Sequence, residues 1–166
     1  MAGTANQVYI ARSIAADKVD SLVKTGVSAA LTLRNGDVVA LGAKTKGVYA
    51  LTAPAADSEL LGIVYNAGVE EIEGYRVGDD PRKITFAPGT PVNVYIPEVG
   101  DEVALTVATS YTSGTSKYLK PTVGDVALTA AAAAPDSGLA YKITGETFVS
   151  VGNERITTIE AMLIAK

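Results

Sequence analysis

The chain has 166 residues, with 14 basic and 18 acidic side chains, a net charge of −4 and 48% apolar residues. This length is sufficient for one domain with a buried core, and the composition excludes a polar, charge-rich disordered chain. Basic residues are scattered, with no cluster longer than Arg82-Lys83, so the basic stripe that nucleic-acid binding needs is missing. We expect a folded protein that has no nucleic-acid partner.

Cysteine and histidine are both absent from the sequence. Without Cys there is no disulfide, thiolate nucleophile or Cys-bound metal, and without His the usual proton shuttle near neutral pH is missing. No Gly-rich stretch matches the phosphate loop or the dinucleotide-binding turn. We therefore expect no catalytic residue, no cofactor and no metal ligand, and we predict that the protein is not an enzyme.

The first residues, Met1 to Asp17, contain Arg12 and no apolar run of signal-peptide length. No other stretch approaches the ~18 apolar residues of a membrane span. We expect no membrane partner, and synthesis in the cytoplasm of the producing cell.

Residues 1–24 are predicted to form an N-terminal arm followed by a short helix. The spacing of apolar residues from Ile14 to Lys24 is helix-like, which predicts the helix there. A short β-branched and aromatic run precedes it and is our candidate interface arm, able to add a strand to a neighbouring subunit. The residues of this candidate arm are Gln7, Val8, Tyr9 and Ile10.

Residues 25–166 are predicted to form one β-rich domain, with a subdivision near residues 74–83 left open. Short β-branched or aromatic runs alternate with Gly, Pro, Asn and Asp roughly every eight to twelve residues, which is typical of all-β proteins. The predicted strands are Gln7 to Ile10, Ala29 to Leu33, Val38 to Leu41, Val48 to Leu51, Leu60 to Val64, Lys83 to Phe86, Val92 to Ile96, Glu102 to Thr106, Val126 to Leu128, Tyr141 to Ile143, Thr147 to Val151 and Arg155 to Ile164. We expect a mainly β fold: an antiparallel β-barrel or β-sandwich with an extended N-terminal arm and at most one or two short helices.

Turn residues mark the connections between several of these strands. Asn35-Gly36-Asp37 predicts a hairpin between Ala29-Leu33 and Val38-Leu41, because Asn-Gly readily adopts positive φ angles. Gly152-Asn153 predicts a second hairpin, and Ala87 to Pro91 a turn before a strand of the kind tolerated at a sheet edge. The alanine-rich stretch from Thr129 to Gly138 is left open between a helical turn and an extended loop.

One phrase occurs three times, as Gly36-Asp37-Val38, Gly100-Asp101-Glu102 and Gly124-Asp125-Val126, each followed by an apolar run. Two interpretations are open: a common turn that leads into a strand, which we favour, and a duplicated β unit. The unequal spacings of 64 and 24 residues do not support a regular solenoid or propeller.

Carboxylates are the main remaining source of chemistry, and we favour solvated loop residues for all of them. The calcium pattern D-x-[DN]-x-[DN]-G is missing, although a weak cation site near Asp79 and Asp80 is left open. An enzyme interpretation would use Tyr75, Arg76, Asp79 and Lys83, but an exposed loop over residues 74–83 is favoured. The acidic clusters are Glu70-Glu71-Ile72-Glu73, Asp79-Asp80 and Asp101-Glu102.

The chain resembles the capsid decoration, or cement, proteins of tailed bacteriophages. The resemblance lies in the strand, Gly-Asp turn, strand phrasing of Leu31 to Gly42, Leu61 to Asn66 and Phe86 to Ile96, and it spans roughly Thr25 to Thr106. It implies a β-barrel or β-sandwich that binds the outside of an assembled capsid, often as a trimer at junctions between capsomers. The implied partners are the major capsid protein and further copies of this chain, and the implied location is the exterior of the virion.

Three other functions are left open by the residues. A carbohydrate- or receptor-contacting β-sandwich would use exposed tyrosines, and a tail or connector protein would form rings or tubes. A hydrolase that relies on Asp79 and Asp80 alone is the least favoured. The tyrosines considered as interface residues are Tyr9, Tyr65, Tyr75, Tyr111 and Tyr118.

Overall fold

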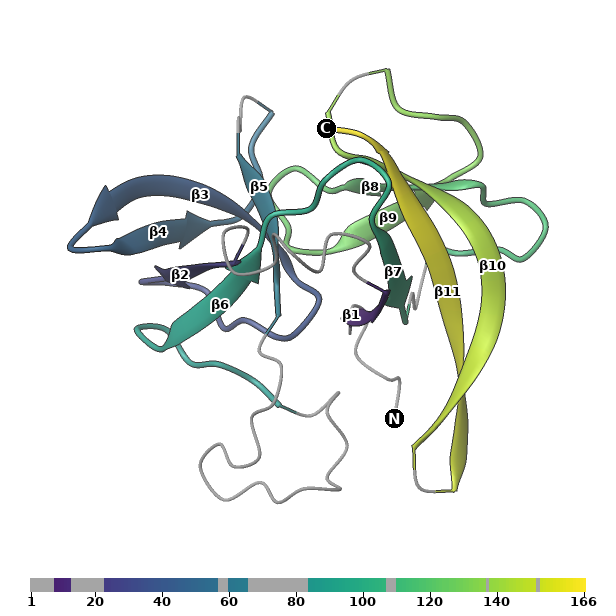
Figure 1. Cartoon of the computed structure of the whole chain (residues 1–166), viewed down its shortest axis with the longest axis horizontal. Coiled ribbons are helices and arrows are strands. Elements are labelled where there is room, and N and C mark those ends of the chain that lie inside the picture. Colours follow the sequence, from purple (N-terminus) through teal and green to yellow (C-terminus); the bar gives the residue numbers. More distant parts are fainter. Residues whose placement is uncertain are drawn as a thin grey trace.

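The computed structural model describes residues 8–12, 23–56, 60–65, 84–106, 110–136, 138–151 and 153–166, which form eleven strands and no helix (Figure 1). The fold is therefore mainly β, as predicted. The strands are β1 (Val8–Arg12), β2 (Val23–Val27), β3 (Val38–Thr45), β4 (Val48–Thr52), β5 (Leu61–Val64), β6 (Pro91–Tyr95), β7 (Glu102–Leu105), β8 (Tyr118–Pro121), β9 (Leu128–Ala131), β10 (Ala140–Val151) and β11 (Glu154–Ala165). None of the described residues belongs to a helix long and apolar enough to cross a membrane.

Five strands close into a barrel in the order β2-β4-β3-β5-β6. All its pairs are antiparallel except β2 with β4, which run parallel and close the barrel. Two glycines allow the strands to approach: a Cβ at Gly26 would lie 2.5 Å from the Leu51 side chain, and one at Gly62 would lie 3.0 Å from the Tyr95 carbonyl oxygen. The barrel core is Leu33, Val39, Leu41, Leu51, Val64, Phe86, Val92 and Val94.

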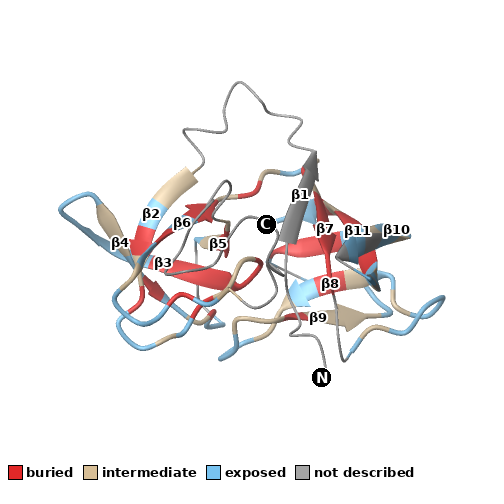
Figure 2. Ribbon diagram, turned by 90° about the horizontal axis from the view of Figure 1, so that it is seen from below, coloured by how far each residue is buried: buried red, intermediate tan, exposed pale blue. Residues whose placement is uncertain are grey.

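The other six strands form an open sheet in the order β1-β7-β11-β10-β8-β9, all antiparallel. Its inner face packs on the barrel, because Val38 and Ile63 of the barrel belong to the same apolar cluster as residues of the sheet. The sheet residues of this cluster and its connections are Val103, Leu105, Leu119, Leu128, Leu139, Tyr141, Ala161 and Leu163. Figure 2 shows buried residues along β3 and β7, one strand from each part.

Two predicted strands are absent from the structure. Ala29-Leu33 is not a strand, since Ser28 Oγ accepts from the Leu31 amide at 3.0 Å and the chain bends there. Only Leu33 pairs, in an isolated bridge with Phe86, so the strand predicted at Lys83-Phe86 is likewise reduced to one residue in its described part. The Asn35-Gly36 turn therefore does not join a hairpin, and β3 pairs with β4 and β5 instead.

Other elements differ in their limits. The helix predicted from Ile14 to Lys24 is wrong at its end, where Val23 and Lys24 belong to β2; residues 13–22 lie outside the described part. β2 also crosses the predicted boundary at residue 24, while the proposed subdivision near 74–83 lies outside the described residues. Strand β8 was not predicted, and β9 begins at Leu128, where the strand predicted from Val126 ends.

The C-terminal hairpin is longer than predicted. The two strands predicted at Tyr141-Ile143 and Thr147-Val151 form the single strand β10, with a shift in register between Ile143 and Gly145. Val151 pairs with Glu154, so a two-residue connection joins β10 to β11, at the predicted place. The stretch from Thr129 to Gly138 begins in β9 and shows no helix in its described residues.

The turn predicted between Ala87 and Pro91 is confirmed. The Thr90 amide donates to the Ala87 carbonyl at 3.0 Å, and Gly89 has a φ of 86°. β6, which follows it, is not at an edge, because it pairs with β2 on one side and β5 on the other. Pro91 is tolerated as the first residue of this strand.

The three Gly-Asp sequences form the same turn. In each, the Asp amide donates to the carbonyl three residues earlier, of Arg34, Glu98 or Thr122, and the Gly has a φ of 80° to 101°. This geometry is a type II turn, which requires a positive φ at its third residue and so favours Gly. In each turn the Gly amide also donates to a carbonyl of another segment: Gly36 to Val64, Gly100 to Leu163, and Gly124 to Pro54. The repeated Gly-Asp sequence thus forms a turn before a strand, and the Gly amide of each turn links it by a hydrogen bond to a segment distant in the sequence.

Candidate functional site

The β10–β11 hairpin extends beyond the strands that flank it (Figure 1). β10 pairs with β8 only at Tyr141 and Lys142, and β11 pairs with β7 only from Ile159 to Met162. The five residue pairs from Thr147–Thr158 to Val151–Glu154 have no other strand partner among the described strands. At about 3.3 Å per residue, these five pairs form a projecting ribbon roughly 16 Å long.

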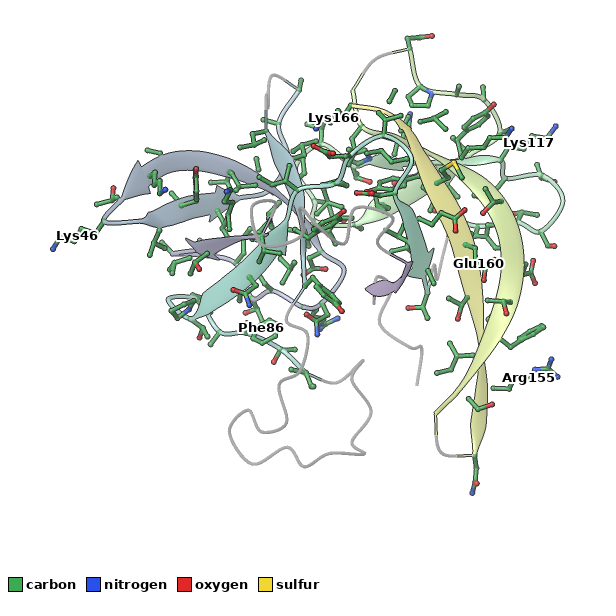
Figure 3. The ribbon with its side chains drawn as sticks, in the orientation of Figure 1. Lys46, Phe86, Lys117, Arg155, Glu160 and Lys166 are labelled. Atoms are coloured by element: carbon green, nitrogen blue, oxygen red, sulfur yellow. The ribbon has the colours of Figure 1, made fainter. Side chains whose placement is uncertain are left out.

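A stacked pair lies on this projecting ribbon, which comprises residues 147–151 and 154–158. The Arg155 guanidinium carbon lies 3.9 Å from the centroid of the Phe148 ring, and Phe148 is 47% exposed. Arg155 lies near the outer end of the ribbon (Figure 3). Aromatic residues and Arg are the types enriched at the centres of protein interfaces. An exposed aromatic and Arg pair on a protruding element is therefore the strongest contact feature in the described surface.

The base of the ribbon is held by a second group of side chains. Tyr111 donates its hydroxyl to the Glu146 carboxylate at 2.8 Å, and Ser113 donates to the same oxygen at 3.0 Å. The bond to Glu146 raises the pKa of Tyr111 above its usual value. These bonds connect the segment before β8 to β10 at the base of the ribbon.

The candidate arm lies at one edge of the sheet. Val8 and Tyr9 pair with Leu105 and Ala104 of β7 in the same chain, and the register shifts before Arg12 pairs with Glu102. Ile10 belongs to the same strand, and Gln7 lies outside the described residues. The opposite edge, β9, is partly closed, because the Ala130 amide donates to Ser110 Oγ at 2.9 Å.

A buried polar group lies between the barrel and the sheet. Tyr95, at the end of β6, donates its hydroxyl to the carboxylate of Asp101, which also accepts from the Glu98 amide at 2.8 Å. Burial raises the pKa of the Tyr141 hydroxyl, which has no hydrogen-bond partner among the described residues. Asp101 is only 4% exposed, and its carboxylate accepts a hydrogen bond within its own turn. This group therefore has a structural role and offers no site that is open to solvent.

Other residues considered from the sequence are dispersed. Tyr65 and Tyr118 are half-buried, and Tyr111 bonds to Glu146 at the base of the ribbon, while the Tyr9 side chain is not described. The acidic cluster Asp101-Glu102 is divided between a buried turn and the start of β7. The remaining candidates lie outside the described residues: Glu70, Glu71, Glu73, Tyr75, Arg76, Asp79, Asp80 and Lys83.

No group of three or more acidic side chains in the described part of the chain is placed to hold a metal ion. The hairpin that forms the ribbon was predicted, with strands at Thr147-Val151 and Arg155-Ile164 joined at Gly152-Asn153. Its projection beyond the sheet and the stacking of Phe148 on Arg155 were not predicted. The signal for this hairpin was the β-branched content of Thr147-Val151 and Arg155-Thr158 on both sides of a two-residue turn.

Comparison with protein-family models, with curated proteins and with solved structures found no significant match for this chain.

Proposed function

We propose that the protein is a structural virion component that binds the outside of a tailed-phage capsid and stabilises the head by bridging capsomers. In this proposal its partners are the major capsid protein and further copies of itself. The trimeric state and the capsid exterior are supported by the resemblance of residues 25–106 to cement proteins. The contact geometry is supported by the projecting ribbon, which is the observation that carries the proposal.

The ribbon suits a bridging role because it reaches past the body of the molecule with both strand edges unpaired by other described strands. A two-stranded ribbon alone is marginally stable in water, so a partner that packs on it or pairs with its edge stabilises it further. Phe148 and Arg155 supply side chains typical of interface centres. A cementing contact requires shape and adhesion, which this element provides.

When one molecule binds several neighbours, each single contact can have a lower affinity. A standard interface buries about 800 Å² per partner, and smaller contacts suffice when several sites on one particle are engaged together. The N-terminal strand and the ribbon lie on the same sheet, with β7 between β1 and β11. Two contact elements on one rigid sheet fit the bridging of adjacent capsomers.

The test is co-sedimentation of the purified chain with phage heads assembled without it, after its mass is measured by light scattering. The wild type is expected to pellet with heads and to remain in the supernatant alone. Phe148→Ser is expected to lower head binding by about tenfold, since truncation of an interface centre costs about 1–2 kcal/mol.

Val123→Ser is the matched control, because Val123 is also apolar and 67% exposed but lies in the turn before β9. Binding of this variant within twofold of the wild type assigns the contact to the ribbon. Equal loss in both variants would reject the ribbon as the contact. A wild-type chain that never pellets with heads, or that binds a glycan array instead, would overturn the proposed function.

A further inference from the structure

The barrel and the sheet are joined where two of the Gly-Asp turns meet. The first turn enters β3, and the third lies in the connection between β8 and β9. The Val38 amide donates to the Val126 carbonyl at 2.8 Å, and the Gly124 amide donates to the Pro54 carbonyl at 2.8 Å. Two backbone bonds therefore cross from the third turn to the barrel, and we call this contact the turn junction.

The turn junction contains a buried carboxylate. Asp37 is 4% exposed, and its Oδ2 accepts from the Arg34 amide at 2.7 Å. The adjacent residue, Val38, makes the bond to Val126, and the Val126 amide is bound at 2.7 Å by Asp125 Oδ1. The carboxylates of the two turns thus flank one inter-sheet hydrogen bond.

The charged groups that act on Asp37 are Arg34 and Asp125. Burial raises the pKa of Asp37 from 3.8 to about 7; the bond from Arg34 and its charge oppose this rise, and the negative charge of Asp125 adds to it. Above that pKa an ionised carboxylate lies buried beside a second acid. Below it, Asp37 is neutral and still accepts the bond that closes its turn.

We propose that the turn junction is a pH-sensitive latch, in which protonated Asp37 holds the third Gly-Asp turn of the sheet on the barrel and ionised Asp37 loosens it. This latch is independent of the proposed function, because it concerns the contact between the two parts of one chain. Its consequence is that the contact between sheet and barrel is firmer below the pKa of Asp37 than above it.

The direction follows from proton linkage. Because the folded-state pKa of Asp37 lies above its unfolded value of 3.8, the folded chain retains a proton that the unfolded chain releases. The stability that this proton provides is complete below pH 3.8 and is lost as the pH rises to about 7. For one proton, the unfolding or opening constant rises by up to tenfold per pH unit in this window.

The latch is tested by amide hydrogen exchange between pH 5 and pH 8, with rates corrected for intrinsic exchange. The Val38 and Gly124 amides, which form the two bonds of the junction, are expected to lose protection by tenfold or more as the pH rises. The Leu163 amide, which donates to the Asp101 carbonyl, is the internal reference and should change less.

Asp37→Asn retains an acceptor for the Arg34 amide and removes the titration, so its Val38 and Gly124 protection should vary less than threefold across the range. Asp101→Asn is the matched control, since Asp101 caps the equivalent turn away from this junction; the loss at Val38 and Gly124 should persist in it. The same loss in Asp37→Asn as in the wild type, or an equal loss at Leu163, would overturn the latch.

Discussion

The guanidinium of Arg155 lies 3.9 Å from the centre of the Phe148 ring, across the two strands of a ribbon that no other described strand supports. The residues sit at diagonal positions, because Phe148 pairs with Thr157 and Arg155 pairs with Ser150. Side chains at diagonal positions remain within reach of each other when one is long and the other aromatic. The stacked pair therefore adds a side-chain contact between the two strands of the ribbon.

Arg155→Ala is expected to loosen the ribbon without unfolding the protein. A cation over an aromatic ring at an exposed site contributes about 0.5–1 kcal/mol. Amides of the ribbon should then exchange roughly two- to fivefold faster, while amides of the barrel are unchanged. Arg155→Lys keeps a cation, so the exchange rates of its ribbon amides should lie between those of the wild type and those of Arg155→Ala. Unchanged exchange in the ribbon of Arg155→Ala would show that the stacked pair contributes nothing.

Two buried tyrosines should respond in opposite ways to loss of the hydroxyl. Tyr95→Phe removes the donor to the buried Asp101 carboxylate and is expected to lower the free energy of unfolding by about 1–3 kcal/mol. Tyr141→Phe removes a hydroxyl that has no partner among the described residues, so it should be neutral or stabilising. Urea unfolding measures both, and a larger loss in Tyr141→Phe than in Tyr95→Phe would contradict the assignment.

The barrel should not tolerate a methyl group at Gly62. An added Cβ would lie 3.0 Å from the Tyr95 carbonyl oxygen and closer still to the Val94 side chain, so the neighbouring strand would have to shift. Gly62→Ala is expected to cost about 1–3 kcal/mol, the usual range for overpacking. Gly42→Ala is the control, because its Cβ would lie 3.5 Å from the nearest atom on an exposed part of β3. Equal thermal midpoints for the two variants would contradict the close approach.

Deletion of residues 1–12 should weaken head binding or self-association and leave the fold intact. Among the side chains that the structure describes, the buried members of both apolar clusters lie between Leu33 and Leu163, so the deletion removes none of them. The deletion does remove β1 and uncovers the edge of β7. A circular dichroism spectrum of wild-type shape together with reduced assembly is the expected pair of results. Unchanged assembly after the deletion would remove the arm from the proposed contacts.

Local sequence patterns predicted most of the strands and not how they pair. Val38-Leu41, Val48-Leu51 and Val92-Ile96 were found because β-branched runs between turn residues favour strands wherever they fold. The bridge between Leu33 and Phe86 joins residues 53 positions apart, and no local pattern encodes such a partner. Closure of the barrel depends on the close approach of Leu51 to Gly26. The sequence around Gly26 does not show which residue lies against it.

The candidate site was predicted in part. The N-terminal strand was expected from Val8-Tyr9-Ile10, but its pairing with β7 of the same chain was not. The hairpin that forms the ribbon was predicted, but the continuity of β10 from Ala140 to Val151 was missed, because Gly145, which ordinarily ends a strand, lies where β10 shifts register and continues. β8 was missed because Tyr118-Leu119-Lys120-Pro121 is short and ends in Pro, so its assignment depends on β9 and β10 beside it.

The hairpin of β3 and β4 ends in Lys46 and Gly47, which have φ angles of 50° and 89° and are exposed at the end of the molecule opposite the ribbon (Figure 3). Residues 42–47 are all exposed, so none of them contributes to the apolar interior. Foreign peptides are accommodated best at such tips, where only solvated backbone is displaced. The Lys46-Gly47 tip is consequently the place to graft an epitope or a fluorescent label while the opposite end remains free to engage its target.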